Sequence, residues 1–357
     1  MIVDRSVFDD SHLPQRLQHR DAEVNQLARA LEPAKQGDPA DDLLISGPPG
    51  VGKSVLTRHT IDRLATRADV QYARIECMGQ TTASIIRDVL GAIGDRPPQN
   101  TAREDLCLQL RERVTDPVVV VLDEASEVHE TKALDRLADV EYISMVVICY
   151  DPDDWLSQAP NRIARRFHGR QLRLDRYGVD ELADILEPRA REGLEHGAVA
   201  RDQLETIADE VAGVARFGIY SLLAAATLAK DRGHDEVLDV DVADAYPLAQ
   251  EWMRQAALDS LAFHHHVLYE IIREAETIDS RTLHQRYDAI ADDIYAGRQR
   301  TPLIKRTRRD KLAKLHGYDL IGQEGGTKDR IYWVLDESVR SGYDIDVRVA
   351  ATKDSEL

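Results

Sequence analysis

The stretch Gly47-Pro-Pro-Gly-Val-Gly-Lys-Ser54 decides the fold of this chain, because it matches the phosphate-loop pattern G-x-x-x-x-G-K-[ST]. Glycines in such a loop let backbone N–H groups converge on phosphate oxygens without interference from Cβ atoms. The spacing predicts that Lys53 reaches the β- and γ-phosphates of a nucleotide and that the Ser54 hydroxyl is a ligand for Mg²⁺. The other residues expected to line the nucleotide in this loop are Pro49, Gly50, Val51, Gly52 and Val55.

The residues on either side of this loop predict a strand before it and a helix after it. Residues 43–46 read as a short buried strand, and residues 55–65 have the apolar spacing of an α-helix. The N-terminus of that helix would lie under the phosphates and favour their negative charge. This context predicts a nucleotide-binding α/β domain.

A second motif lies at the end of another predicted strand. Residues 118–122 form a continuous apolar run, typical of a central parallel strand buried on both faces, and Asp123 and Glu124 follow it directly. There Asp123 would hold Mg²⁺, directly or through water, and Glu124 would polarise the water that attacks the γ-phosphate. Alone, these carboxylates could be ordinary turn residues; after a phosphate loop they indicate ATP or ADP with Mg²⁺ as cofactors.

The composition points away from membrane-spanning and disulfide-rich proteins. The chain has 357 residues, enough for two or three domains, and its N-terminus lacks a signal-peptide pattern. Its apolar runs fall short of the roughly 18 residues of a membrane span. Cys77, Cys107 and Cys149 lack C-x-x-C spacing and are expected to be free, buried thiols. These features predict a cytoplasmic protein with no membrane partner.

The net charge of −18 would normally argue against nucleic acid as a partner. The acidic residues are dispersed over most predicted helices, however, and arginine supplies most of the cations. This pattern favours a halophilic archaeal source over an ordinary acidic cytosolic protein. In molar salt the Debye length falls to about 3 Å, so dispersed surface acid would repel DNA only weakly.

The order of predicted elements divides the chain into domains. Residues 1–170 alternate strand and helix patterns, which predicts a parallel sheet. Residues 171–258 carry helical patterns without strands and are expected to form a lid. Residues 259–345 read as three helices followed by a hairpin, the order of a winged helix-turn-helix domain, and residues 346–357 read as a tail.

Positive charge is concentrated in the third helix of that last domain, which is expected at 302–316. Between Arg298 and Lys314, eight cations stand against the single acid Asp310. A solvated helix face would not require such a concentration in an acidic chain, whereas a basic helix beside a wing can neutralise phosphates and reach the major groove of DNA. The predicted DNA-binding residues are Lys305, Arg306, Arg308, Arg309, Lys311, Lys314, Lys328 and Arg330.

These features together resemble the archaeal origin-recognition initiators, AAA+ ATPases related to eukaryotic ORC subunits and the Cdc loader. The most specific strings are His265-His266-Val-Leu-Tyr269, Leu283-His-Gln-Arg-Tyr287, Lys311-Leu-Ala-Lys-Leu315 and Gly317-Tyr-Asp-Leu-Ile321. The resemblance covers nearly the whole chain. It implies a AAA+ P-loop parallel sheet with a helical lid, followed by a winged helix.

The resemblance also implies roles for residues outside the two phosphate motifs. The string that ends at Arg20, Leu13-Pro-Gln-Arg-Leu-Gln-His-Arg20, looks like the family's box beside the adenine. Gly213-Val-Ala-Arg216 is similar to the motif whose arginine reaches the γ-phosphate from the lid. Tyr177 and Arg189 are implied as further nucleotide contacts.

The place of the family's arginine finger is taken by Asn161-Arg-Ile-Ala-Arg-Arg166. Arg162 fits this role best, with Arg165 and Arg166 as rivals. The catalytic residues expected from the sequence and the resemblance together are Glu124, Arg162 and Arg216.

Three departures from the family pattern affect hydrolysis. Tyr150 stands where the family has an asparagine, and it cannot supply the same short amide to the γ-phosphate and the attacking water. Val214 replaces the aspartate before Arg216, and the segment after Cys77 is abbreviated. We expect a divergent paralogue that binds ATP tightly and hydrolyses it slowly, if at all.

The leading interpretation is an ATP-binding initiator that recognises repeats in duplex DNA at a replication origin, as a monomer or by assembling on DNA. Recruitment of the replicative helicase is implied by the resemblance alone. One alternative is a nucleotide-switched transcriptional or plasmid-maintenance regulator, which Tyr150 favours slightly. Another is a P-loop ATPase that acts on protein partners, which the basic third helix disfavours.

Overall fold

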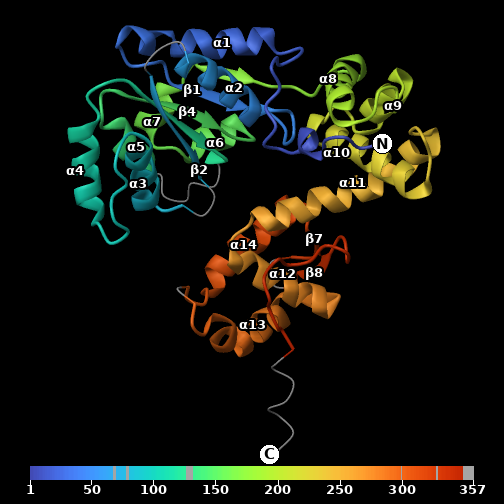
Figure 1. Cartoon of the computed structure of the whole chain (residues 1–357). Helices are drawn as coiled ribbons and strands as arrows, with labels where there is room; N and C mark the ends of the chain where they lie inside the picture. The colour runs from blue at the N-terminus through green and yellow to red at the C-terminus, as the bar shows by residue number, and fades with distance from the viewer. Residues whose placement is uncertain (67–69, 78–79, 126–131, 299, 327–328, 349–357) are drawn as a thin grey trace, which may run out of the picture. The chain divides into compact units, whose positions relative to one another are not determined.

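The computed structural model describes residues 1–66, 70–77, 80–125, 132–298, 300–326 and 329–348. The chain divides into two compact units, Met1–Val242 and Ala243–Leu357 (Figure 1). The finer division into base, lid, winged helix and tail stays a prediction.

The first unit is built on a five-stranded parallel sheet with the order β2-β3-β4-β1-β5. The strands are β1 (Leu43–Ser46), β2 (Gln71–Glu76), β3 (Val118–Asp123), β4 (Ile143–Ile148) and β5 (Gln171–Arg173). Because all five run in the same direction, the segments that follow β1 and β3 emerge at the same edge. That edge therefore brings together the phosphate loop and the Asp123-Glu124 pair.

Every residue of β3 is buried, which explains its uninterrupted apolar run. Val118, Val120 and Leu122 belong to one hydrophobic core, and Val119 and Val121 to another on the opposite face of the sheet. The first core is completed by α3 (Thr82–Ala92), α4 (Arg103–Arg113), α5 (Lys132–Ala138), α6 (Pro152–Gln158) and α7 (Asn161–Arg166). The second core is completed by α1 (Asp21–Leu31), η2 (Glu32–Gln36) and α2 (Lys53–Ala65). Figure 1 shows α1 and α3 on opposite sides of the strands.

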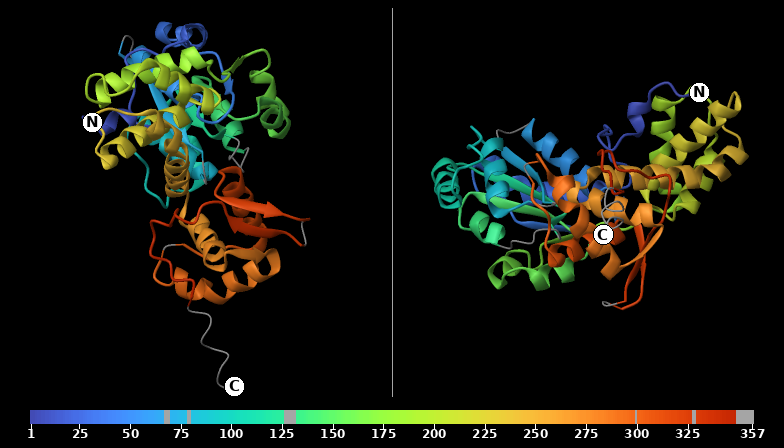
Figure 2. Two further views of the ribbon diagram at one scale, coloured as in Figure 1. Left: turned by 90° about the vertical axis from the view of Figure 1, so that its right-hand side faces the viewer. Right: turned by 90° about the horizontal axis from the view of Figure 1, so that it is seen from below.

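Helices follow the sheet, as the sequence predicts. They are α8 (Val179–Gly193), α9 (Arg201–Glu210) and α10 (Ala215–Arg232), and α11 (Asp239–Ser260) spans the boundary between the two units. The N-terminal 3₁₀ helix η1 (Arg5–Phe8) packs beside α8 and α10 (Figure 2). Phe8 lies so close to Gly193 that a Cβ atom there would overlap its ring. This packing fixes the N-terminal segment on the helices after the sheet.

The second unit has the element order of a winged helix. Its elements are α12 (Phe263–Ala275), β6 (Thr277–Asp279), α13 (Ser280–Tyr295), α14 (Lys305–Gly317), β7 (Ile321–Glu324) and β8 (Ile331–Val334). The three strands form an antiparallel sheet of order β6-β8-β7. Figure 2 shows the β7–β8 hairpin projecting beside the three helices.

Three sequence predictions about elements are wrong. Two short strands were missed: β5, which pairs with β1 just after residue 170, and β6, which pairs with β8. The third helix begins at Lys305 and not at residue 302. Leu303 donates its N–H to the Tyr287 hydroxyl at 3.0 Å and Ile304 is extended, so the chain turns helical only after this anchor.

No helix among the described residues is long and apolar enough to cross a membrane. The three cysteines are free and buried, which confirms the expectation from their spacing.

The histidines of the second unit make its stability depend on pH. His265 is 1% exposed, and burial lowers its pKa to about 3. In an unfolded chain a histidine has a pKa of about 6.5. The unfolded state therefore binds a proton that the folded state excludes, and stability is lost as the pH falls from about 6.5 towards about 3. Burial also lowers the pKa of His264, His266 and His284.

We expect the free energy of unfolding of this unit to fall as the pH drops below 6.5, by about 1.4 kcal/mol per pH unit for His265. Urea unfolding at pH 7.5 and pH 5 measures the change. His265→Leu should flatten the dependence, and His316→Gln, at an exposed position in the same unit, should not. A slope in His265→Leu as steep as in the natural chain would contradict this assignment.

Candidate nucleotide site and DNA-binding helix

The phosphate loop has the backbone conformation that its glycines allow. Gly50 and Gly52 have φ values of +75° and +94°, which residues with a Cβ atom rarely adopt. A Cβ atom on Gly50 would lie 2.7 Å from Val214 Cγ1, so the loop also packs closely against the segment before α10. Leu56 donates its N–H to the Gly52 carbonyl at 2.8 Å, which starts α2 directly after the loop.

Lys53 lies inside the curve of this loop. Its Nζ atom donates to the carbonyl oxygens of Gly47 at 2.6 Å and Pro48 at 2.8 Å. Burial lowers the pKa of its ammonium group. Desolvation of this kind strengthens any interaction between the ammonium group and an anion in the loop.

Ser54 and Asp123 meet next to Lys53. The Ser54 hydroxyl donates to Asp123 Oδ1 at 3.1 Å, and Arg74 Nη2 donates to Asp123 Oδ2 at 2.9 Å. Asp123 is 5% exposed, so these bonds satisfy a carboxylate that would otherwise be buried at a high cost. A hydroxyl beside a carboxylate is an oxygen donor set that Mg²⁺ accepts, so these two residues fit the predicted metal.

Glu124 follows in a left-handed backbone conformation, with φ of +53°. Its N–H donates to Asp123 Oδ1 at 3.1 Å, and its own side chain is exposed. Non-glycine residues with positive φ concentrate at functional sites. The strained backbone turns Glu124 out of the strand at the edge where the phosphate loop lies.

Arg20 and Tyr177 form a second cluster beside the loop. The Arg20 guanidinium lies 4.0 Å from the Tyr177 ring centroid and donates to the Tyr177 hydroxyl at 2.9 Å. Arg20 also donates to Glu23 at 2.9 Å and to the Asp175 carbonyl at 2.6 Å. A Cβ atom on Gly52 would lie 3.8 Å from the same hydroxyl, so the structure brings both residues to the loop, as the resemblance implies.

Arg216 also lies against the loop. Its N–H donates to the Gly50 carbonyl at 3.1 Å, and its guanidinium is paired with Asp10 of the N-terminal segment. Arg189, in contrast, is engaged elsewhere. It is 8% exposed and donates to the Val7 carbonyl, so it holds the N-terminal segment, and the contacts of its side chain place it outside the cluster around the loop.

The three candidate finger arginines differ in their surroundings. Arg162 donates to Asp139 at 2.7 Å and to Asp135 at 3.1 Å, both from α5 or the turn after it, and its side chain is 53% exposed. Arg166 is paired with the buried carboxylate of Asp42, which is a structural contact. Arg165 is exposed, and among the described residues its side chain makes no hydrogen bond or ion pair.

Tyr150 is 64% exposed, so its side chain faces solvent after β4. The residue before it, Cys149, is buried, and burial raises its thiol pKa to about 12. Neither residue offers an amide at the end of β4. Slow hydrolysis stays a prediction.

The DNA-binding prediction for α14 needs correction at two positions. Lys305, Arg306 and Arg309 are exposed and Lys311 is half-buried. Arg308 is 4% exposed, stacks 4.1 Å from the Tyr287 ring centroid and pairs with Asp288, so it holds α14 on α13. Lys314 is 8% exposed and packs near Tyr318, so it too faces inward.

Of the two predicted wing residues, Arg330 is half-buried just before β8, and Lys328 lies outside the described residues. The exposed cations at the start of α14 therefore offer the clearest surface for DNA phosphates. We call Lys305, Arg306 and Arg309 the basic face.

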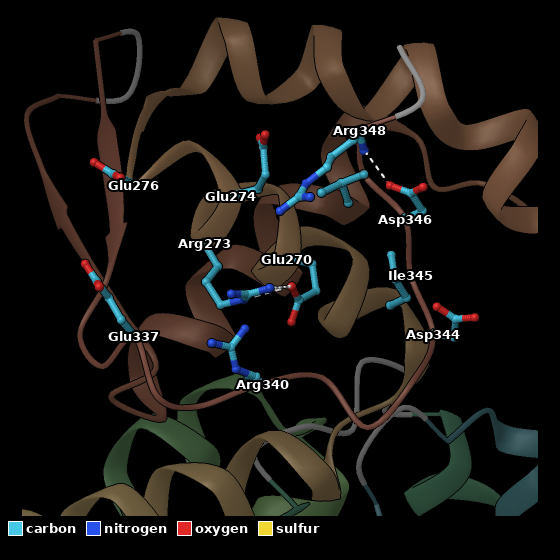
Figure 3. Close-up of a pocket in the computed structure, with 11 residues that line it drawn as sticks. Glu270, Arg273, Glu274, Glu276, Glu337, Arg340, Asp344, Ile345, Asp346 and Arg348 are labelled. Carbon is cyan, nitrogen blue, oxygen red and sulfur yellow. Dashed lines mark hydrogen bonds and ion pairs between the residues drawn. The ribbon is translucent and has the colours of Figure 1, made fainter. Parts of the chain in front are cut away.

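A cavity of about 580 Å³ lies elsewhere in the second unit (Figure 3). Six acidic residues and three arginines line it, so its charge does not suit DNA phosphates. Arg273 pairs with Glu270, one turn away on α12, at 2.6 Å, and Arg348 donates its backbone N–H to Asp346 at 2.9 Å (Figure 3). Neither the phosphate loop nor the basic face contributes to this cavity.

Two site residues were missed by sequence reasoning. Arg74 forms an ion pair with Asp123, and Asp10 forms an ion pair with Arg216. Arg74 lies in a strand where exposed and buried residues alternate. In the sequence it therefore cannot be distinguished from an ordinary solvent-facing residue. Its position beside β3 could be inferred only from the pairing of β2 with β3.

A phosphate loop between β1 and α2, a carboxylate pair after β3 and an arginine held against the loop by the following helices define a P-loop ATPase of the AAA+ class. Residues 16–292 match the family model described as AAA ATPase domain. Over 301 residues the chain is 30% identical to ORC1-type DNA replication protein 1 of Halobacterium salinarum, covering 82% of this chain and 97% of that protein. The chain belongs to the ORC1-type DNA replication proteins of the AAA ATPase family.

Two further similarities extend along nearly the whole chain. ORC1-type DNA replication protein 9 of Halobacterium salinarum is 29% identical over 347 residues, with 96% of each chain covered. The Aeropyrum pernix ORC1 protein, solved in complex with DNA, shares the fold with a TM-score of 0.74, 21% identity and 93% coverage of each chain. The organism of the two relatives agrees with the halophilic archaeal source expected from the charge pattern.

Proposed function

We propose that this protein binds ATP in the first unit and duplex DNA through the winged helix of the second, and that it marks a replication origin. The observation that carries the proposal is the joint presence of a complete phosphate site and a basic, exposed helix face in a chain of the ORC1-type family. The name of that family describes DNA replication, and the Aeropyrum relative was solved on DNA. Neither feature alone would distinguish an initiator from other P-loop proteins.

In this proposal each residue around the loop has a separate task. Lys53 binds the β- and γ-phosphates, while the N-terminus of α2 favours their charge. Ser54 and Asp123 would hold Mg²⁺, which neutralises phosphate charge when bound. Arg20 and Tyr177 lie beside the loop at the place expected for the adenine, and Arg216 contacts the γ-phosphate.

Hydrolysis is proposed to be slow. Glu124 is exposed at the strand edge where it can orient a water molecule, but exposed Tyr150 supplies no amide to help position that water. Arg162 or Arg165 would act on the nucleotide of a neighbouring copy, since neither is held at the loop of its own chain. Bound ATP would then act as a switch. It would shift the equilibrium between different arrangements of the lid and the winged helix.

Glu124→Gln is expected to leave ATP affinity unchanged and to remove residual hydrolysis, because the amide keeps the shape of the side chain and loses the base. ATP affinity by calorimetry and phosphate release over hours measure the two effects. Glu112→Gln, on the exposed end of α4, serves as the control. An unchanged turnover rate in Glu124→Gln would assign the chemistry to another residue.

A nucleotide-switched regulator is the second candidate, and the exposed Tyr150 favours it because a regulator needs no turnover. Footprinting on the native replicon separates the two. Protection of repeats at the origin supports the initiator, whereas protection confined to a promoter supports the regulator. Recruitment of the replicative helicase is a further proposal, which a pull-down with the helicase tests.

A further inference from the structure

We propose that Asp10 competes with the γ-phosphate for Arg216 and thereby sets how strongly the nucleotide site prefers ATP over ADP. This inference rests on the proposed nucleotide site. It adds a residue from the N-terminal segment that none of the sequence motifs includes.

The contact between the two residues is bidentate. Arg216 Nε donates to Asp10 Oδ1 at 2.9 Å, and Nη2 donates to Oδ2 of the same carboxylate. Paired hydrogen bonds of this kind are the geometry in which a guanidinium also binds phosphate. A γ-phosphate that uses this edge of the guanidinium must displace Asp10, and one that approaches beside it meets a like charge.

Arg216 is fixed close to the phosphate loop through its backbone. Its N–H donates to the Gly50 carbonyl at 3.1 Å, and a Cβ atom on Gly50 would lie 3.2 Å from Arg216 Cβ. Any anion paired with this guanidinium is therefore held at the side of the loop where the γ-phosphate of ATP is expected. ADP lacks that phosphate, so it does not compete with Asp10.

Asp10 is held in place from both directions along the chain. Before it, Arg189 donates to the Val7 carbonyl and Phe8 packs against Gly193. After it, Arg58 Nη2 donates to the Ser11 carbonyl at 2.9 Å, and Arg58 belongs to α2, the helix that follows the phosphate loop. The carboxylate is thus presented to Arg216 by the fold of the segment.

The surrounding charges and the exposure limit the size of the effect. Glu124 and Tyr220 also lie near Arg216, and the two paired side chains are 48% and 47% exposed. Partly exposed ion pairs are screened by solvent and salt. We therefore expect a change in affinity of about fivefold, which corresponds to the upper end of such pairs.

The test compares Asp10→Asn with Asp9→Asn in the full chain. Both variants remove one negative charge from neighbouring positions, but only the first removes the contact with Arg216. Calorimetry with ATP and with ADP is expected to show about fivefold tighter ATP binding in Asp10→Asn, an unchanged ADP affinity, and little effect in Asp9→Asn. In an Arg216→Ala background, Asp10→Asn should have no effect on ATP affinity.

Four results would overturn the inference. Weaker ATP binding in Asp10→Asn would mean that Asp10 orients Arg216 towards the phosphate. Equal changes for ATP and ADP, or equal changes in the two asparagine variants, would mean a general charge effect. An effect of Asp10→Asn that persists without Arg216 would exclude the competition. Failure of the natural chain to bind ATP at all would instead overturn the proposed nucleotide site.

Discussion

Replacement of Lys53 by alanine is expected to weaken ATP binding by at least about 100-fold. The ammonium group lies inside the phosphate loop, in hydrogen bonds with the Gly47 and Pro48 carbonyl oxygens, and burial has already removed part of its hydration. Hydrogen bonds to a charged group contribute roughly 1.5–3 kcal/mol each, and this residue is expected to bind two phosphates. No other described lysine lies in the loop.

Calorimetry with ATP measures the change. Lys230→Ala, at an exposed position on α10, controls for the removal of one positive charge. A thermal unfolding curve should show that Lys53→Ala remains folded. ATP affinity in Lys53→Ala equal to that of the control would remove the phosphate-loop assignment.

Charge reversal on α14, Arg306→Glu with Arg309→Glu, is expected to reduce DNA affinity by about 30-fold or more. Both side chains are exposed near the N-terminal end of the helix, where winged-helix relatives of the helix-turn-helix class reach into the major groove. Each interaction of this kind is worth about 1–3 kcal/mol. For every phosphate that the variant no longer neutralises, the slope of log affinity against log salt should also become shallower by about 0.9.

The matched control is Arg103→Glu with Arg113→Glu on α4, which changes the net charge of the chain equally in the other unit. Binding to labelled duplex at several KCl concentrations measures affinity and slope together. If both double variants weakened binding equally, the effect would come from net charge. If neither slope changed, DNA would contact a different face of the protein.

Most of the nucleotide site could be predicted because it depends on local sequence. The loop, the helix after it and the carboxylates after β3 each follow from a short stretch, and the parallel sheet then brings the two stretches to one edge. Asp10 and Arg74 could not be found in this way. Their partners Arg216 and Asp123 are distant in sequence, and an isolated aspartate or arginine carries no pattern of its own.

The basic helix α14 shows a second limit of prediction from sequence, which concerns the direction in which charged side chains face. Its charge was visible in the sequence, but Arg308 and Lys314 turn inward because α14 packs against its neighbours through one face. Arginine and lysine have long apolar stems that permit such burial when the charge finds a partner or the stem packs on an aromatic ring. Charge counting cannot separate these residues from the exposed Arg306 and Arg309.

The short strands β5 and β6 escaped prediction for a third reason. Each has three residues, too few for a periodic pattern, and each is defined by its pairing with a longer strand. Tertiary contacts decide such elements, whereas the buried run of β3 is readable by itself.

The most direct test of the account is binding to duplex DNA that carries the inverted repeats beside the gene for this protein, compared with scrambled duplex, at high KCl with ATP or ADP. We predict specific binding to the repeats and a difference between the two nucleotides, because the ATPase unit is proposed to control the winged helix. Equal affinity for native and scrambled duplex, whichever nucleotide is present, would contradict the assignment as an initiator.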